Sequence, residues 1–153
     1  MIKKNPNKGT FVDWRHLDNL NNFSKENPEL AYYLIVNLFN EKVELSTRID
    51  SFKEIVKKYN KDCFLGTSLF AYLMSAFDSH NYTIYKDDVF QEFGDLFDIQ
   101  IPSSVSEKYE FYIKLCHELL DYFRQNSYLD CPLLLDIQDF IFSISAYNLS
   151  LEE

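Results

Sequence analysis

Turn-forming residues are scarce in this sequence, which contains only 3 glycines and 4 prolines among 153 residues. All-β sandwiches and barrels need many tight turns, and glycine and proline are the residues that most turns prefer. The scarcity therefore argues against an all-β fold and favours long helices. The length fits one domain, and the hydrophobic (46%) and charged (25%) fractions are those of a globular protein rather than a disordered chain. We predict an all-α fold, a single-domain helical bundle.

Apolar residues at helical spacing predict six or seven helices within residues 13–149, after a flexible lead-in over residues 1–12. The expected helices lie near residues 14–26, 28–40, 43–60, 67–78, 89–97, 105–126 and 132–147. The second of these is apolar nearly all round, which predicts a central position in the bundle. The third is amphipathic. Its predicted buried stripe is Leu45, Ile49, Phe52, Val56 and Tyr59, and its predicted exposed cations are Arg48, Lys53, Lys57 and Lys58.

Polar residues before several of these helices can cap their N termini, because their side chains accept hydrogen bonds from backbone N–H groups left free in the first turn. Pro28 suits the first helical position, where its missing N–H costs nothing. The predicted capping residues are Asp13, Asn27, Thr67 or Ser68, and Asp87 or Asp88.

The segment HNYTIYK, residues 80–86, interrupts the helical pattern and is predicted to form one irregular connector. Large side chains alternate along it, which is typical of extended backbone. No partner strand is visible in the sequence, so we expect no sheet. A solvated loop has no need of three large side chains. We therefore expect at least two of Tyr82, Ile84 and Tyr85 to be buried against the two preceding helices.

The sequence shows no sign of secretion or of a membrane span. Its first ten residues, MIKKNPNKGT, lack the apolar core of a signal peptide, and no run of about 18 apolar residues occurs. The 3 cysteines are an odd number without a recognisable spacing, which does not suggest a disulfide framework. We therefore expect a cytoplasmic protein with reduced thiols and no membrane contact.

No motif in the sequence predicts catalysis or cofactor binding. There is no GxxxxGK[ST] or GxGxxG motif, so no glycine-rich loop is expected to hold phosphates. The neighbours Cys116 and His117 point about 100° apart on a helix, so they are not expected to form a metal site. The pair Ser79–His80 is interpreted as a surface turn, and Cys116 as a core residue. We predict no enzyme activity, no cofactor and no metal site.

Four segments share their pattern and their order with one known family. They are ELSTRIDSF (44–52), SLFAYLMSAFDSHNYTIYK (68–86), YEFYIKLCHELLDYF (109–123) and LLLDIQDFIF (133–142). Together they resemble the helical region that lies amino-terminal to the AAA+ motor in McrB-type restriction ATPases. The matched positions, taken as candidate interaction residues, are Arg48, Asp50, Tyr82, Tyr85, Lys86, Gln138 and Asp139.

The resemblance implies a non-catalytic helical module of a restriction or phage-defence system, which packs against a linked AAA+ motor or a separate protein partner. The nucleotide-binding motor and a recognisable modified-base reader are both missing from this sequence, so ATPase, GTPase and nuclease activity are not implied. Each matched residue also has a purely structural interpretation, as an exposed ion pair, a connector anchor or a polar helix position. We favour that interpretation, because a shared fold element keeps the same residues whatever its function.

Two other functions stay open. A free-standing acidic inhibitor, such as a phage-encoded DNA mimic, would occupy the basic groove of a nucleic-acid-binding protein, and the net charge of −9 suits it. However, the 24 acidic residues are spread evenly without long runs, which is modest for a mimic. A small-molecule-binding bundle would line a pocket with its phenylalanines and tyrosines, but no polar cluster in the sequence supports it.

We expect the isolated chain to bind duplex DNA weakly, with a Kd above about 10⁻⁵ M at physiological salt, because few cations are available to neutralise phosphates. The 15 basic residues are outnumbered by 24 acidic ones and are mixed with them along the chain. A mobility-shift titration measures this affinity. Tight binding that is lost as salt is raised would contradict the expectation and reveal a folded basic patch.

Overall fold

The described residues, 12–126 and 130–147 of the computed structural model, form seven α-helices and no strand. The helices are α1 (Trp14–Glu26), α2 (Pro28–Leu38), α3 (Leu45–Tyr59), α4 (Thr67–Phe77), α5 (Asp87–Leu96), α6 (Val105–Gln125) and α7 (Leu134–Tyr147). The predicted all-α, single-domain bundle is confirmed. The predicted lead-in lies outside the described residues apart from Val12, which is buried, and residues 148 and 149 of the predicted domain lie outside them too.

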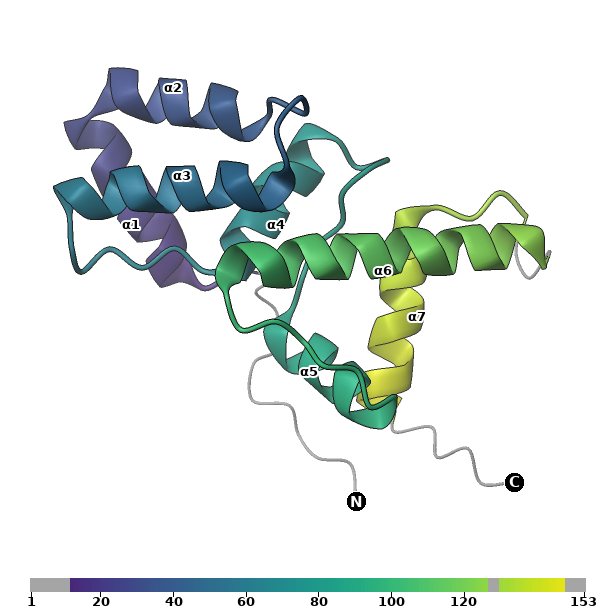
Figure 1. Cartoon of the computed structure of the whole chain (residues 1–153). Coiled ribbons are helices and arrows are strands. Elements are labelled where there is room, and N and C mark those ends of the chain that lie inside the picture. The colour runs from purple at the N-terminus through teal and green to yellow at the C-terminus, as the bar shows by residue number, and fades with distance from the viewer. Residues whose placement is uncertain (1–11, 127–129, 148–153) are drawn as a thin grey trace.

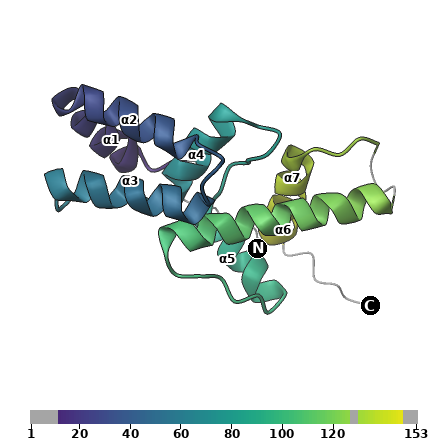
Figure 2. The ribbon, with the colours of Figure 1, turned by 45° about the horizontal axis from the view of Figure 1, so that its top comes forward.

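The longest helix of the described residues, α6, runs from the middle of the molecule to the side opposite α1, α2 and α3 (Figure 1). It packs against α3, α4 and α7, so it touches both halves of the bundle. Helices α1, α2 and α3 gather on one side, and α5 packs against α7 away from them (Figure 2). The connector passes between these groups as it joins α4 to α5. None of the helices in the described ranges is long and apolar enough to cross a membrane.

Two predicted helix starts are confirmed. Asp13 caps α1, and its carboxylate accepts a hydrogen bond from the Arg15 backbone N–H at 2.9 Å. Pro28 occupies the start of α2. Asn27 stands at the predicted N-cap of α2, but its side chain makes no capping bond and instead donates to the Phe23 carbonyl near the end of α1.

The predicted cap of α4 is wrong, because Gly66 takes the N-cap position rather than Thr67 or Ser68. The His16 ring explains this glycine, since a Cβ atom on residue 66 would clash with the ring. Thr67 lies in the first turn, and its hydroxyl donates to the Val105 carbonyl at 3.4 Å. The start of α4 is therefore fixed by α1 and α6 rather than by its own side-chain cap.

The predicted cap of α5 is also wrong, because Lys86 is its N-cap residue. Asp87 and Asp88 lie in the first turn, where carboxylates interact favourably with the partial positive charge of a helix N terminus. Their carboxylates pair with Lys108 at 3.0 Å and with Lys86 at 3.6 Å respectively. Ion pairing with neighbours takes the place of capping here.

Helix α2 lies at the edge of the bundle, and the predicted central position is wrong. Its main neighbours are α1 and α3 alone, so only one of its faces is covered. Leu34 and Leu38 are buried on that face. Tyr32, Tyr33 and Val36 point away from it and keep 73%, 57% and 49% of their surface exposed. An apolar helix is thus left half uncovered.

Helix α3 follows the predicted stripe for four of its five residues. Tyr59 is the exception, because it lies at the last turn and is 60% exposed. Arg48 departs from the prediction in the other direction, since it was expected to face solvent and is only 7% exposed. The physical reason is that its guanidinium has buried hydrogen-bond partners in the Leu38 carbonyl and the Tyr82 hydroxyl. The four confirmed core residues are Leu45, Ile49, Phe52 and Val56.

Candidate functional site

The connector (residues 80–86) is non-helical and packed into the bundle, as predicted. Tyr82 is 8% exposed and Tyr85 1% exposed, while Ile84 is half-buried, which confirms that at least two of the three are buried. Tyr82 meets α3, as expected. Tyr85 packs its ring against Phe90 of α5 and Tyr112 of α6, which are not the two helices named in the expectation.

The start of the connector is a turn held by Asp78, as the interpretation of Ser79–His80 predicts. The Asp78 carboxylate accepts from the His80 backbone N–H at 2.9 Å and from the Asn81 side chain at 2.7 Å. These hydrogen bonds lower the pKa of Asp78, with the Asn81 bond contributing most. The turn redirects the chain from α4 onto α6.

Helix α6 provides hydrogen-bond donors to the connector backbone. Tyr109 donates from its hydroxyl to the Thr83 carbonyl at 3.0 Å, and Tyr112 donates to the Ile84 carbonyl at 3.0 Å. Burial raises the pKa of both tyrosines well above the usual range, so both keep the proton that they donate. Side chains of α6 thus give the connector carbonyls the hydrogen bonds that the backbone of a neighbouring strand would give in a sheet.

A third donor from α6 is His117, whose Nε2 lies 3.0 Å from the Asn81 carbonyl oxygen. Since a carbonyl oxygen only accepts, Nε2 carries the proton in this bond. The preceding residue, Cys116, is buried as predicted, and burial raises the pKa of its thiol to about 12. The two side chains therefore have separate structural roles on α6.

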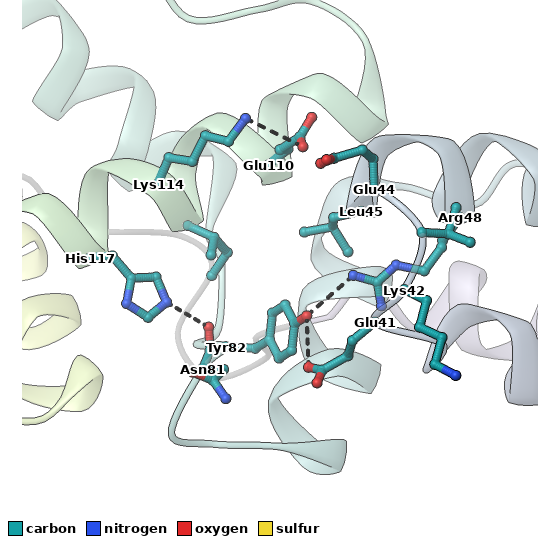
Figure 3. Close-up of a pocket in the computed structure, with 12 residues that line it drawn as sticks. Glu41, Lys42, Glu44, Leu45, Arg48, Asn81, Tyr82, Glu110, Lys114 and His117 are labelled. Carbon is teal, nitrogen blue, oxygen red and sulfur yellow. Dashed lines mark hydrogen bonds and ion pairs between the residues drawn. The ribbon is translucent and has the colours of Figure 1, made fainter.

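Arg48 joins α3 to the connector and to the end of α2. Its Nη1 donates to the Leu38 carbonyl at 2.7 Å, and its Nη2 donates to the Tyr82 hydroxyl at 3.2 Å. The Tyr82 hydroxyl in turn donates to Glu41 Oε1 at 3.2 Å (Figure 3). The Nε atom is buried and has no hydrogen-bond partner within the described part of the chain. Asp50 is exposed and pairs with Lys53 at 3.7 Å, so the predicted exposed ion-pairing face does not include Arg48.

The far end of the connector is tied to α5 and α6. The Tyr85 hydroxyl donates to Asp87 Oδ1 at 2.7 Å, and the same oxygen pairs with Lys108 at 3.0 Å. Partial burial acts to raise the pKa of Asp87, but the bonds from Tyr85 and Lys108 outweigh it and the pKa is lowered. Burial also raises the pKa of Tyr85, helped by the neighbouring carboxylate.

Helix α7 contributes one of its two matched residues to the connector. Gln138 Oε1 accepts from the Thr83 hydroxyl at 2.7 Å. Asp139 is exposed and lies away from this contact. Lys86 is half-buried and pairs with Asp88. The structure therefore brings Arg48, Tyr82, Tyr85, Lys86 and Gln138 to the connector, and leaves Asp50 and Asp139 on the surface.

A cleft of about 420 Å³ lies beside the Arg48–Tyr82 contact, between the 41–45 loop, the connector and α6 (Figure 3). Three acidic and three basic side chains line it, and Glu110 and Lys114 pair across one turn of α6 at 3.4 Å. No three histidine, cysteine, aspartate or glutamate side chains lie close enough to hold a metal ion within the described ranges. The charged residues that line the cleft are Glu41, Lys42, Glu44, Arg48, Glu110 and Lys114.

The sequence did not indicate the hydroxyl donors of α6 as site residues, nor the residues that line the cleft apart from Arg48 and Tyr82. The four-residue spacing of Glu110 and Lys114 was the signal for that ion pair. Tyr109 and Tyr112 fall on the apolar stripe of α6, so the sequence predicts their rings as core and says nothing of their hydroxyl partners. Those partners lie more than twenty residues away along the chain.

Comparisons with protein families, with curated proteins and with solved structures found no match to this chain. The resemblance to the helical region of McrB-type ATPases stays a prediction that rests on the four segments. In the structure these segments meet at the connector: they provide Arg48, the connector itself, the tyrosines of α6 and Gln138. Their contacts with one another support the structural interpretation of the matched residues.

Replacement of Tyr82 by phenylalanine should lower the free energy of unfolding by about 1.5–3 kcal/mol, because the buried Arg48 guanidinium loses an acceptor. Urea denaturation followed by circular dichroism measures this loss. Tyr72→Phe is the matched control, since that tyrosine is 46% exposed on α4, and it should leave stability unchanged within about 0.5 kcal/mol. Unchanged stability of Tyr82→Phe, together with a lost partner interaction, would instead make the connector a recognition segment.

Proposed function

We propose that this chain is a non-catalytic helical module that acts by packing against a protein partner. The proposed partner is a nucleic-acid-directed AAA+ motor of a restriction or phage-defence system, either linked to the module or separate, in the cytoplasm. The four segments that resemble the McrB-type helical region support the choice of system. The uncovered face of α2 supports action by packing, and it is the observation that carries the proposal.

The uncovered face of α2 is apolar and continues onto α4. Tyr32, Val36 and Phe39 are spaced four and three residues apart, so they lie on one side of the helix. Phe39 stacks on Phe77 of α4, with ring centroids 4.2 Å apart and planes within 4°. Phe77 is itself 47% exposed. No charged residue interrupts the segment 30–40 that carries most of this surface.

An apolar surface of this kind is typical of protein interfaces, because exposed aromatic groups in contiguous patches favour association. Covering on the order of 300 Å² of it would contribute about 7 kcal/mol, before the cost of association is subtracted. That magnitude suits a specific but reversible contact. We call Tyr32, Val36, Phe39 and Phe77 the α2 outer face.

One observation favours the acidic-inhibitor alternative. Asp88, Glu92 and Asp95 are exposed and lie four and three residues apart, so they form a row of carboxylates along α5. A basic DNA-binding groove could bind such a row by charge attraction. The row is short, and Asp88 is already paired with Lys86, so we place this function second.

The proposal is tested by co-expression with a Walker-motif ATPase encoded beside the gene. We expect the two proteins to co-purify, and we expect the Tyr32→Glu/Val36→Glu variant to lose the complex, because two carboxylates would be buried in the interface. Leu135→Glu is the control, since that residue is 56% exposed on α7 and lies off the α2 outer face.

A complex that survives the Tyr32→Glu/Val36→Glu change, or the failure of any such ATPase to bind the folded chain, would contradict the proposal. Binding to a basic DNA-binding protein that is lost in an Asp88→Asn/Glu92→Gln/Asp95→Asn variant would favour the acidic inhibitor instead. Circular dichroism of each variant establishes that its helices are intact.

A further inference from the structure

A groove of about 190 Å³ runs between α2 and α3, which lie side by side (Figure 1). Tyr33 and Asn37 form its α2 wall, and they are spaced one helical turn apart. Thr47, Ser51 and Ile55 form its α3 wall, and each lies about one helical turn from the next. Both walls are therefore straight rows of side chains along neighbouring helices, and the loop that joins α2 to α3 adds Asn40 and Val43 to the lining.

The shape of this groove suits a third helix. Thr47 and Ser51 are small and exposed, so they leave room for another backbone to approach α3 closely. Tyr33, which is 57% exposed, and the half-buried Ile55 provide apolar contact on the two sides. Helices pack by placing a row of side chains into the groove between two rows of a neighbour, and amphipathic helices bind protein grooves in the same way.

The charge of the groove differs from that of the rest of the chain. None of the residues that line it is acidic, although the chain carries 24 acidic residues and a net charge of −9. Its one charged lining residue within the described part of the chain is Arg48, which is shared with the neighbouring cleft. The Arg48 guanidinium donates to two neutral groups, the Leu38 carbonyl and the Tyr82 hydroxyl. The Glu41 carboxylate is one step further away, since it accepts from the same Tyr82 hydroxyl.

We infer that the α2–α3 groove binds an amphipathic helix of the protein partner, with a carboxylate of that helix placed at the Arg48 end. This inference rests on the proposed function and names the element that the partner contributes. Charge complementarity decides the sign of the charge on the bound helix. The buried Arg48 guanidinium has no carboxylate of the described residues bonded directly to it and so favours a negative group nearby, and the other lining residues of the groove are uncharged. The apolar side of the bound helix covers Tyr33 and Ile55.

Two synthetic peptides serve as probes. Each is a Leu/Ala-rich helix about 20 residues long, because shorter helices are marginal in water, and the two differ only in having Glu or Lys beside one end of the apolar stripe. Fluorescence anisotropy measures affinity, and ¹⁵N–¹H spectra of the full chain locate the site. We expect the Glu peptide to bind at least about tenfold more tightly, although the net charge of the chain favours the Lys peptide. We also expect its binding to shift the amides of Asn37, Thr47 and Ser51.

Ser51→Glu places a carboxylate in the groove at an exposed position and should weaken the Glu peptide by about tenfold or more. Gln125→Glu adds the same charge at the exposed end of α6 and should leave its affinity within about twofold. Equal binding of both peptides, shifts that map elsewhere, or no binding would overturn the inference. So would a dimer of the chain that Ser51→Glu dissociates, since a second copy would then fill the groove.

The two proposals can fail separately. One outcome is that the Tyr32→Glu/Val36→Glu variant loses the ATPase complex while neither peptide binds the chain. That result would support the proposed function and reject the groove as the binding site of the partner helix. Peptide binding with the expected charge preference, without any ATPase complex, would keep the groove and reject the motor as partner.

Discussion

An extended segment buried among helices has no neighbouring strand, so its carbonyl groups need donors from elsewhere. In this protein α6 provides them, through the hydroxyls of Tyr109 and Tyr112 and through Nε2 of His117. Phenylalanine at the two tyrosine positions would fill the same space, but each buried carbonyl would lose its partner at a cost of about 1–3 kcal/mol. This constraint gives the tyrosines a role beyond that of core aromatic rings.

The rest of the bundle is arranged around the same segment. Tyr82 receives the Arg48 guanidinium and thereby links α3 and the end of α2 to the connector, while Thr83 bonds Gln138 and links α7. Five of the seven residues that carry the family resemblance therefore lie in the connector or hydrogen-bond to it. Through Arg48 the connector is also linked to the end of α2, the helix whose outer face is the surface on which the proposed function depends.

Periodicity predicted the helices and the burial of the connector, because those follow from local spacing. It did not predict the edge position of α2, since an apolar pattern records which residues avoid water and not how many neighbours are available to cover them. The partners of the tyrosine hydroxyls could not be predicted from the sequence either, because they are set by packing over long sequence separations. The burial of Arg48 could have been predicted, since it lies three residues after Leu45 and four before Phe52, at the spacing of the buried stripe.

The central claim is that hydroxyl donors from α6 hold the connector in place. Urea denaturation of Tyr109→Phe, Tyr112→Phe and the double variant tests it most directly, with Tyr32→Phe as the exposed control at 73% exposure. The account predicts that each single change lowers the free energy of unfolding by about 1–3 kcal/mol and that the control does not change it. Equal stability of all four variants and the original chain would contradict the account.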